Sequence, residues 1–180
     1  MRVLDVGCGD GILSGDLVRA GVSTVIGLDR DAGVLARARQ LHHALNITWV
    51  LGDIHEQAFE PDSFDAVVSV AALHHMDAAS SLTRFAQLTK PGGVVAVVGL
   101  AASEWHDLPL AAAAFVARQL GGLTWGRWEH TAPAVWPPPL TYGDMKRLSA
   151  RVLPGVRYQR HLLGRYSLVW RKPERDTTCP

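Results

Sequence analysis

The stretch Val3-Leu-Asp-Val-Gly-Cys-Gly-Asp-Gly11 constrains the fold most, because an apolar strand there breaks into glycines at alternate positions. An amphipathic segment, residues 12–20, follows at once. Glycines at a strand-to-helix turn let the backbone pass close to a bound ligand, since no Cβ stands in the way. The dinucleotide fingerprint is G-x-G-x-x-G, and Ile12 occupies the place of its third glycine. We therefore expect a ligand at this loop, and the spacing argues against a pyrophosphate cofactor.

The first hundred residues alternate apolar strands with amphipathic helices, which is the pattern of an α/β fold with a doubly wound, mostly parallel sheet. The expected strands are Val3–Val6, Thr24–Leu28, Ile47–Leu51, Ala66–Val70 and Val94–Val98. The fourth of them is apolar on both faces, as a buried parallel strand is.

Two further helices are expected between these strands. The first has one apolar face, made of Val34, Ala38, Leu41 and Leu45. The second covers about residues 79–88 and ends before Lys90-Pro91-Gly92-Gly93, whose composition predicts a turn.

The sequence changes character after Gly99. Residues 108–120 predict an alanine-rich helix, and residues 123–140 form an irregular stretch rich in tryptophan and proline. A helix is expected over about residues 142–152, with Thr141 as its N-cap and Asp144 three residues further on. Two closing strands, residues 156–162 and 166–170, are predicted to form an antiparallel hairpin.

The composition, 48% apolar and 19% charged, is that of one globular domain over residues 1–180. No apolar run approaches the roughly 20 residues of a spanning helix, and we expect no signal peptide before the first strand. Cys8 and Cys179 make no disulfide or zinc framework, so we expect a cytoplasmic protein. Residues 141–180 carry nine Lys and Arg against three Asp and Glu. This segment could attract nucleic acid, but we interpret it as solvated strand and tail residues.

Five features occur in order over residues 1–100: the glycine loop, Asp29, Asp53, the fourth strand and Leu88-Thr-Lys-Pro-Gly-Gly93. Together they resemble the class I S-adenosylmethionine-dependent methyltransferases, in particular relatives of the ubiquinone and menaquinone C-methyltransferases. The resemblance implies a Rossmann-like seven-stranded sheet ending in an antiparallel hairpin, with residues 1–100 as the donor-binding half. Family members carry helices before the first motif. The resemblance therefore implies either a longer native chain or a donor covered by residues 101–140 alone.

In that family the glycine loop wraps the methionyl and ribose portions of the donor, which assigns Gly7, Gly9 and the backbone amide of Cys8 to donor binding. Asp29 ends the second strand, where a carboxylate accepts hydrogen bonds from both ribose hydroxyls. The structural alternative for Asp29 is an N-cap of the following helix, a role that Asp31 can itself fill.

The adenine is assigned to the next loops by the same resemblance. Asp53 matches the acidic position that accepts a hydrogen bond from the adenine amino group, and the backbone of Ile54 would serve the ring nitrogen. A loop aspartate is otherwise often a turn former. Arg30 would lie against the adenine by analogy, and a surface arginine is the alternative.

Asp5 is a carboxylate inside an apolar strand, where burial without a partner is costly. We expect it to accept hydrogen bonds from the loop amides or to face the cationic end of the donor. Cys8 has no cationic neighbour in the sequence that would activate its thiol, so we expect that thiol to be inert. Val70 ends the fourth strand, which faces the donor methyl group in the family.

His74 and His75 follow the fourth strand and could supply a general base near neutral pH. The structural alternative is that one imidazole packs against the donor loop and the other faces solvent. We expect no metal site here, because adjacent side chains should point apart and no third ligand is evident.

Residues 101–140 are interpreted as a substrate lid inserted after the fifth strand. Its aromatic and polar residues suit a flat or apolar acceptor, although tryptophans also build local cores under long loops. They are Trp105, His106, Trp125, Trp128, Glu129, His130 and Trp136.

The predicted function is methyl transfer from S-adenosylmethionine to a small-molecule acceptor, with S-adenosylhomocysteine as product. The acceptor, the methylated atom and the oligomeric state stay open. One alternative is a non-catalytic protein that binds the donor or its product, and another is a nicotinamide-dependent oxidoreductase on the same sheet. A nucleic-acid methyltransferase is disfavoured, because Ala71-Ala72-Leu73-His74 stands where the Asn/Asp-Pro-Pro-Tyr motif belongs.

Overall fold

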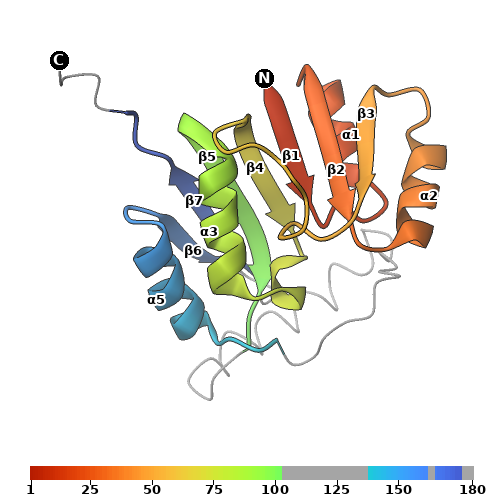
Figure 1. The fold of residues 1–180 in the computed structure, drawn as a ribbon. Coiled ribbons are helices and arrows are strands. Elements are labelled where there is room, and N and C mark those ends of the chain that lie inside the picture. Colours follow the sequence, from red (N-terminus) through yellow and green to blue (C-terminus); the bar gives the residue numbers. More distant parts are fainter. Residues whose placement is uncertain (103–137, 162–164, 176–180) are drawn as a thin grey trace.

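The computed structural model describes residues 1–102, 138–161 and 165–175. They form one seven-stranded sheet with the order β3-β2-β1-β4-β5-β7-β6 (Figure 1). The strands are β1 (Arg2–Val6), β2 (Thr24–Asp29), β3 (Ile47–Leu51), β4 (Phe64–Val70), β5 (Thr89–Leu100), β6 (Arg157–His161) and β7 (Arg165–Arg171). The pairs among β1 to β5 are parallel, and β7 pairs antiparallel with both β5 and β6. The predicted doubly wound sheet and its closing antiparallel pair are confirmed.

Helices cover both faces of this sheet. They are α1 (Ile12–Arg19), α2 (Ala32–Leu41), the short 3-10 helix η1 (Leu73–His75), α3 (Ala78–Leu88) and α5 (Tyr142–Val152). The chain winds outward in one direction through β1, β2 and β3, and in the other through β4 and β5. Right-handed crossovers therefore put α1 and α2 on one face and α3 on the other. Helix α5 packs beside α3 (Figure 1). No helix among the described residues has the length and apolarity needed to cross a membrane.

The parallel pairing brings the ends of the first four strands to the same edge of the sheet. Val6, Asp29, Leu51 and Val70 are the last residues of β1, β2, β3 and β4. The strand order reverses between β1 and β4, and in open α/β sheets a ligand binds outside the strand ends at such a switch point. A ligand site is therefore expected at the loops that follow these strands.

The turn predicted at Lys90-Pro91-Gly92-Gly93 is not present, because these residues continue β5 from Thr89. The pairing with β4 shifts register there, and Gly92 has a φ of +74°. The amide of Gly92 donates to the carbonyl of Lys172, and the amide of Lys172 donates to the carbonyl of Gly93. Backbone hydrogen bonds to a segment far along the chain thus keep residues 90–93 in an irregular strand, although their composition favours a turn.

The predicted apolar face of α2 is confirmed at Ala38 and wrong at Leu41 and Leu45. Its buried residues are Leu35 and Ala38, whereas Leu41 is 58% exposed and Leu45 lies beyond the helix end. The buried row continues at His42, which is 8% exposed. Spacings of three and four residues place Leu35, Ala38 and His42 on one helical face, so a histidine occupies the position that an apolar residue was expected to take.

The C-terminal part follows its sequence signals closely. Helix α5 begins with the predicted capping box, in which the Thr141 side chain accepts from the Asp144 amide and Asp144 returns the contact. The described part of the chain holds both strands of the predicted hairpin, paired from Arg157↔Val169 to His161↔Arg165. The predicted helix at 108–120 and the tryptophan-rich cluster lie outside the described residues, and so does most of the lid predicted at 101–140.

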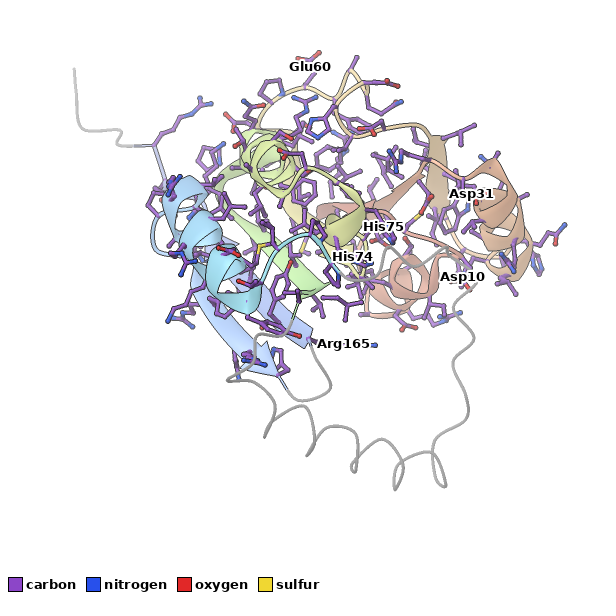
Figure 2. The ribbon with its side chains drawn as sticks, turned by 90° about the horizontal axis from the view of Figure 1, so that it is seen from below. Asp10, Asp31, Glu60, His74, His75 and Arg165 are labelled. Atoms are coloured by element: carbon purple, nitrogen blue, oxygen red, sulfur yellow. The ribbon has the colours of Figure 1, made fainter. Side chains whose placement is uncertain are left out.

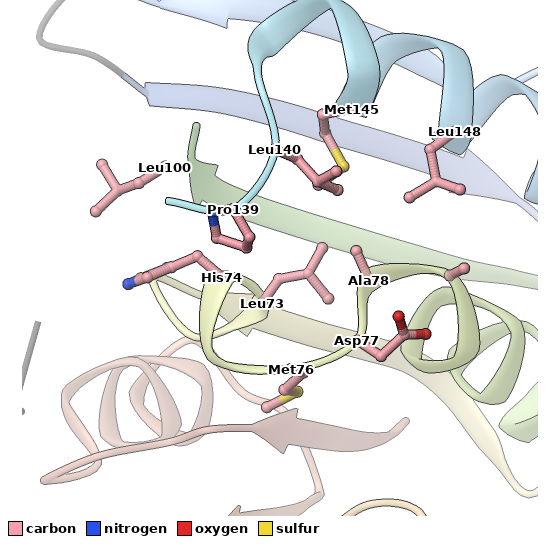
Figure 3. A pocket seen from close by; sticks show the side chains of 11 residues that line it. Leu73, His74, Met76, Asp77, Ala78, Leu100, Pro139, Leu140, Met145 and Leu148 are labelled. Atoms are coloured by element: carbon pink, nitrogen blue, oxygen red, sulfur yellow. The ribbon is translucent and has the colours of Figure 1, made fainter. Parts of the chain in front are cut away.

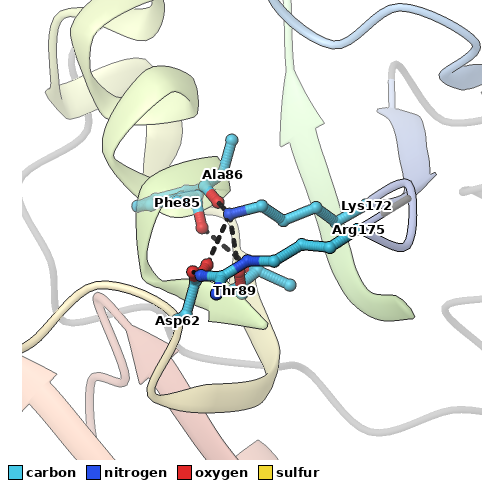
Figure 4. Close-up of polar contacts among 6 residues, drawn as sticks. All are labelled: Asp62, Phe85, Ala86, Thr89, Lys172 and Arg175. Carbon is cyan, nitrogen blue, oxygen red and sulfur yellow. Dashed lines mark hydrogen bonds and ion pairs between the residues drawn. The ribbon is translucent and has the colours of Figure 1, made fainter. Parts of the chain in front are cut away.

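A lysine from the end of the sheet ties the last described segment to α3 (Figure 4). The Lys172 Nζ donates to the carbonyls of Ala86 and Thr89 and to Asp62 Oδ1, at 2.7–2.9 Å. Arg175 also pairs with Asp62. The last carbonyls of a helix have no intrahelical partner, so this ammonium satisfies groups that would otherwise rely on water.

We expect Lys172→Met to lower the free energy of unfolding by about 1–2 kcal/mol at pH 7, measured by urea titration. The Lys172 and Arg175 contacts lower the pKa of Asp62. The contribution of the ionised Asp62 to stability is therefore complete above its ordinary pKa of 3.8. It is lost as the pH falls through the lower pKa of the folded protein. The difference between the two proteins should shrink in that acidic range. Lys146→Met, on the exposed side of α5, is the matched control. An equal loss in both variants would contradict this role.

Candidate functional site

The glycine loop is held by backbone hydrogen bonds to the end of β2. The amides of Gly7 and Cys8 both donate to the Leu28 carbonyl, at 2.8 and 3.1 Å. Gly7, Gly9 and Gly11 have φ values of +69°, +57° and +79°, a region that residues with a Cβ rarely adopt. The alternate glycines thus fold the chain tightly over the strand ends.

The three glycines differ in what surrounds them. A Cβ on Gly7 would lie 2.2 Å from the Cβ of Ala72, and one on Gly11 would lie 2.2 Å from the Trp49 ring. A Cβ on Gly9 would meet no atom within 4 Å. Gly7 and Gly11 are therefore required by packing within the protein. Gly9 is the glycine that leaves open space beside the loop.

The side chains of Trp49 and His42 support the glycine loop. Neither residue was predicted from the sequence. The Trp49 indole fills the space beside both Gly11 and Gly27, and its ring centroid is 6.0 Å from that of His42. His42 Nε2 lies 3.1 Å from the carbonyl oxygen of Asp10, within the loop. The available signal was Gly27, because a glycine inside an apolar strand often marks the close approach of another group.

Asp29 lies half-buried at the end of β2, directly beside the open side of the loop. Its Oδ2 accepts from the Gly9 amide at 2.9 Å, and its Oδ1 accepts from the Asp31 amide at 3.0 Å. Asp31 caps α2 by accepting from Gly33 and Val34, so Asp29 is free of the capping role. An ionised carboxylate offers about four acceptor positions, so each Asp29 oxygen keeps capacity for one more donor.

Asp53 and Arg30 lie together on the neighbouring loops. Asp53 Oδ1 accepts from the His55 amide at 2.9 Å, and Asp53 Oδ2 lies 3.4 Å from Arg30 Nη1. The Arg30 side chain is 60% exposed, so this ion pair contributes little to stability. Ile54 is buried in the hydrophobic core, and its side chain anchors the loop. The structure thus brings the three predicted adenine residues to one corner of the site.

Of the two arrangements expected for Asp5, contact with the loop amides is not what the structure has. Its carboxylate is buried and accepts from the Ser14 hydroxyl on α1 at 2.7 Å. The amides of Gly7 and Cys8 donate instead to the Leu28 carbonyl, and the Gly9 amide donates to Asp29. That Asp5 faces the cationic end of the donor stays a prediction. Burial, opposed by the Ser14 contact and reinforced by Asp29, raises the pKa of Asp5 to about 6.

Cys8 agrees with the expectation of an inert thiol. Its side chain is buried, and burial together with the nearby Asp5 and Asp29 carboxylates raises the pKa of the thiol well above its usual range. The pKa shifts of Asp5 and Cys8 also indicate a negative electrostatic potential at the site. Carboxylates converge beneath the loop, so the open space beside Gly9 favours a ligand that carries positive charge.

The expectation that His74 and His75 point apart was wrong. They share the short helix η1, and their ring centroids are 4.0 Å apart (Figure 2). Burial, with the nearby His75, lowers the pKa of His74 to about 4. Burial and Arg30 lower the pKa of His75, opposed by Asp29. His75 therefore lies within the field of the Asp29 corner, and both rings are neutral at pH 7.

Val70, at the end of β4 and just before η1, is 40% exposed. It leaves an apolar surface exposed at the strand end that leads into η1. The described residues contain no group of three or more His, Cys, Asp or Glu side chains that could hold a metal ion.

The site residues therefore fit a cationic nucleoside on three observations. Asp29 keeps two acceptor positions for a diol, Gly9 leaves the adjoining space open, and carboxylates surround it. The same arrangement lacks free loop amides for a pyrophosphate at Gly7 and Cys8, because both donate to Leu28.

Comparison with known proteins gives consistent matches. A family model described as a methyltransferase domain matches residues 3–93. An uncharacterized methyltransferase of Mycobacterium bovis is 40% identical over 177 residues, covering 95% of this chain and 87% of that protein. A ubiquinone biosynthesis O-methyltransferase of Proteus mirabilis is 39% identical over 98 residues, covering 52% of this chain and 40% of that protein.

Among solved structures, an S-adenosylmethionine-dependent methyltransferase from Mesorhizobium loti superposes with a TM-score of 0.64 at 22% identity. The superposition covers 95% of this chain and 90% of that one. At this identity the likeness concerns the fold, and it extends to the antiparallel end of the sheet.

We expect Gly27→Ala to destabilise the protein by about 1–3 kcal/mol, because the new Cβ would overpack against Trp49. That Cβ would lie 2.6 Å from the indole and 3.0 Å from Cys8 Sγ. Trp49→Leu makes room, so the same change in that background should cost at least about 1 kcal/mol less in urea unfolding. Gly143→Ala, where a Cβ meets nothing nearer than 3.4 Å, is the control. Strict additivity of the two changes would refute this support of the loop.

Proposed function

Because the chain belongs to the class I S-adenosylmethionine-dependent methyltransferases, we propose that its site transfers the donor methyl group to a small-molecule acceptor. The observation that carries the site assignment is the Asp29 carboxylate, which is bound to the open glycine loop and keeps one free acceptor position on each oxygen. The name of the Proteus mirabilis relative, a ubiquinone biosynthesis enzyme, supports an acceptor of small-molecule size.

We assign donor binding to residues from three loops, those that follow β1, β2 and β3. Asp29 would hold the ribose hydroxyls, while Gly9 and the backbone of Cys8 lie beneath the chain that continues from the ribose. Asp53 and the backbone of Ile54 would hold the adenine. Arg30 would cover its ring, kept in place by the contact with Asp53. Asp5 lies too deep to touch a ligand and acts through its charge.

S-adenosylmethionine supplies a methyl group already activated by its sulfonium. The protein therefore contributes mainly position and the exclusion of water. The rigid loop, fixed by two amides on Leu28 and supported by Trp49 and His42, provides the position. Val70 and the paired imidazoles would form the wall on the acceptor side.

We propose that His75 and His74 act on the acceptor rather than on the donor. Both rings are neutral at pH 7, so each can accept a hydrogen bond from an acceptor hydroxyl or amine. The lowered pKa makes His74 a weak base, which suits orientation of the acceptor more than full removal of its proton. We also propose a cytoplasmic location, where a free thiol such as Cys8 stays reduced.

Asp29→Ala should weaken S-adenosylhomocysteine binding by about 100-fold or more in calorimetry, because it removes a charged acceptor of two hydroxyl hydrogen bonds. Asp31→Ala, two residues away, removes a helix cap and serves as the control. It should lower the free energy of unfolding by about 1 kcal/mol and leave ligand affinity nearly unchanged. Equal affinities for wild type and Asp29→Ala would exclude Asp29 from the site.

Donor binding should tighten with rising pH through the pKa of Asp5, which is about 6. A cation bound nearby favours the ionised carboxylate, so binding releases a proton and weakens as the pH falls. We expect roughly a tenfold gain between pH 5 and pH 7 for S-adenosylmethionine, and less for S-adenosylhomocysteine with its smaller positive charge. Asp5→Asn should remove this dependence. Its persistence in that variant would assign the effect to another group.

A further inference from the structure

A cavity of about 360 Å³ lies on the other side of η1 from the glycine loop (Figure 3). It is bounded by η1 and the start of α3, by the end of β5, and by the segment that leads into α5. The lining residues are Leu73, His74, Met76, Asp77, Ala78, Ala79, Leu100, Pro139, Leu140, Met145 and Leu148. This volume lies within the range of small-ligand sites, roughly 300–1,000 Å³.

The lining is mainly apolar. Only His74 and Asp77 among the lining residues have polar side chains. The Asp77 side chain is exposed and caps α3 by accepting from the Ser80 amide at 2.8 Å, so its charge lies at the solvent side of the cavity. His74 is neutral at pH 7. An anionic ligand group would thus be desolvated here without a partner, whereas an apolar group would gain from burial.

The cavity is separated from the donor loop by one layer of side chains. Met76 lines the cavity, and its Cε lies 3.7 Å from the position of a Cβ on Gly7. His74 lines the cavity, while His75, with its ring 4.0 Å away, lies in the field of Asp29 and Arg30. The paired imidazoles therefore lie at the boundary of the two compartments, with His74 at the cavity and His75 nearer the Asp29 corner. The two methionines, Met76 and Met145, give the wall shape adaptability.

We propose that this cavity binds an uncharged, apolar portion of the methyl acceptor, an alkyl chain or hydrocarbon ring, with the polar reacting end extending past His74 toward His75 and the donor site. This inference rests on the proposed function of the donor site and names the substrate class of the same enzyme. The acceptor is then an amphipathic molecule with a polar group next to a hydrocarbon portion. The affinity of the protein for the acceptor then depends on the cavity, whereas its affinity for the methyl donor does not.

The test uses a series of 4-alkylphenols from methyl to hexyl, titrated by calorimetry into the protein saturated with S-adenosylhomocysteine. Burial of each methylene should tighten binding about three- to fourfold until the cavity is full. Ala79→Phe places a ring in the cavity and should remove this length dependence, weakening the longest phenol at least about tenfold. Ala150→Phe, the same change on the exposed side of α5, should bind the series like wild type.

Leu148→Asn, which adds an amide to the wall, serves as a second variant if Ala79→Phe does not fold, and it should also flatten the series. A flat series in wild type, or an unchanged series in the cavity variants, would overturn the proposal for the cavity. Loss of S-adenosylhomocysteine binding by wild type would instead overturn the proposed function. Since the donor product is titrated first, the two failures are distinguished.

Discussion

The hydrogen bond from the Gly9 amide to the Asp29 carboxylate connects the parts of this structure that matter for function. It joins the glycine loop after β1 to the end of β2, and the amides of Gly7 and Cys8 reinforce it through the Leu28 carbonyl. The contact orients the carboxylate and leaves acceptor capacity on both of its oxygens. It also needs a positive φ at Gly9, which glycine adopts without strain. The binding geometry and the backbone conformation are therefore set by the same few atoms.

The support beneath that contact is as specific as the contact itself. Trp49 fills the space that Gly11 and Gly27 leave, and His42 reaches the Asp10 carbonyl from the end of α2. Burial, together with the neighbouring carboxylates, raises the pKa values of Asp5 and Cys8. This charge lowers the stability of the isolated protein and favours a cationic ligand, a common arrangement at functional sites. On the opposite side of η1, the cavity is lined mainly by apolar side chains and favours an uncharged group.

Local periodicity predicted most of the strands and helices, and the family resemblance implied their arrangement in the seven-stranded sheet. The strand bounds at Ile47–Leu51 and the capping box at Thr141 were predicted to the residue. The errors had tertiary causes. Residues 90–93 carry a turn composition but pair with Lys172, and α2 buries His42 because Trp49 and the glycine loop receive it. Asp5 found Ser14 on α1, a partner nine residues away that no motif announced.

The sequence by itself determined the family, the doubly wound sheet and the positions of Asp29, Asp53 and the glycine loop, since spacing along the chain is enough to place residues at strand ends. Only the tertiary structure decided which glycine faces open space and which of the two aspartates, Asp29 or Asp31, is free to bind. It also decided that the rings of His74 and His75 lie side by side, with an apolar cavity beside His74. These outcomes depend on contacts between segments far apart in the chain, and local pattern carries no information about them.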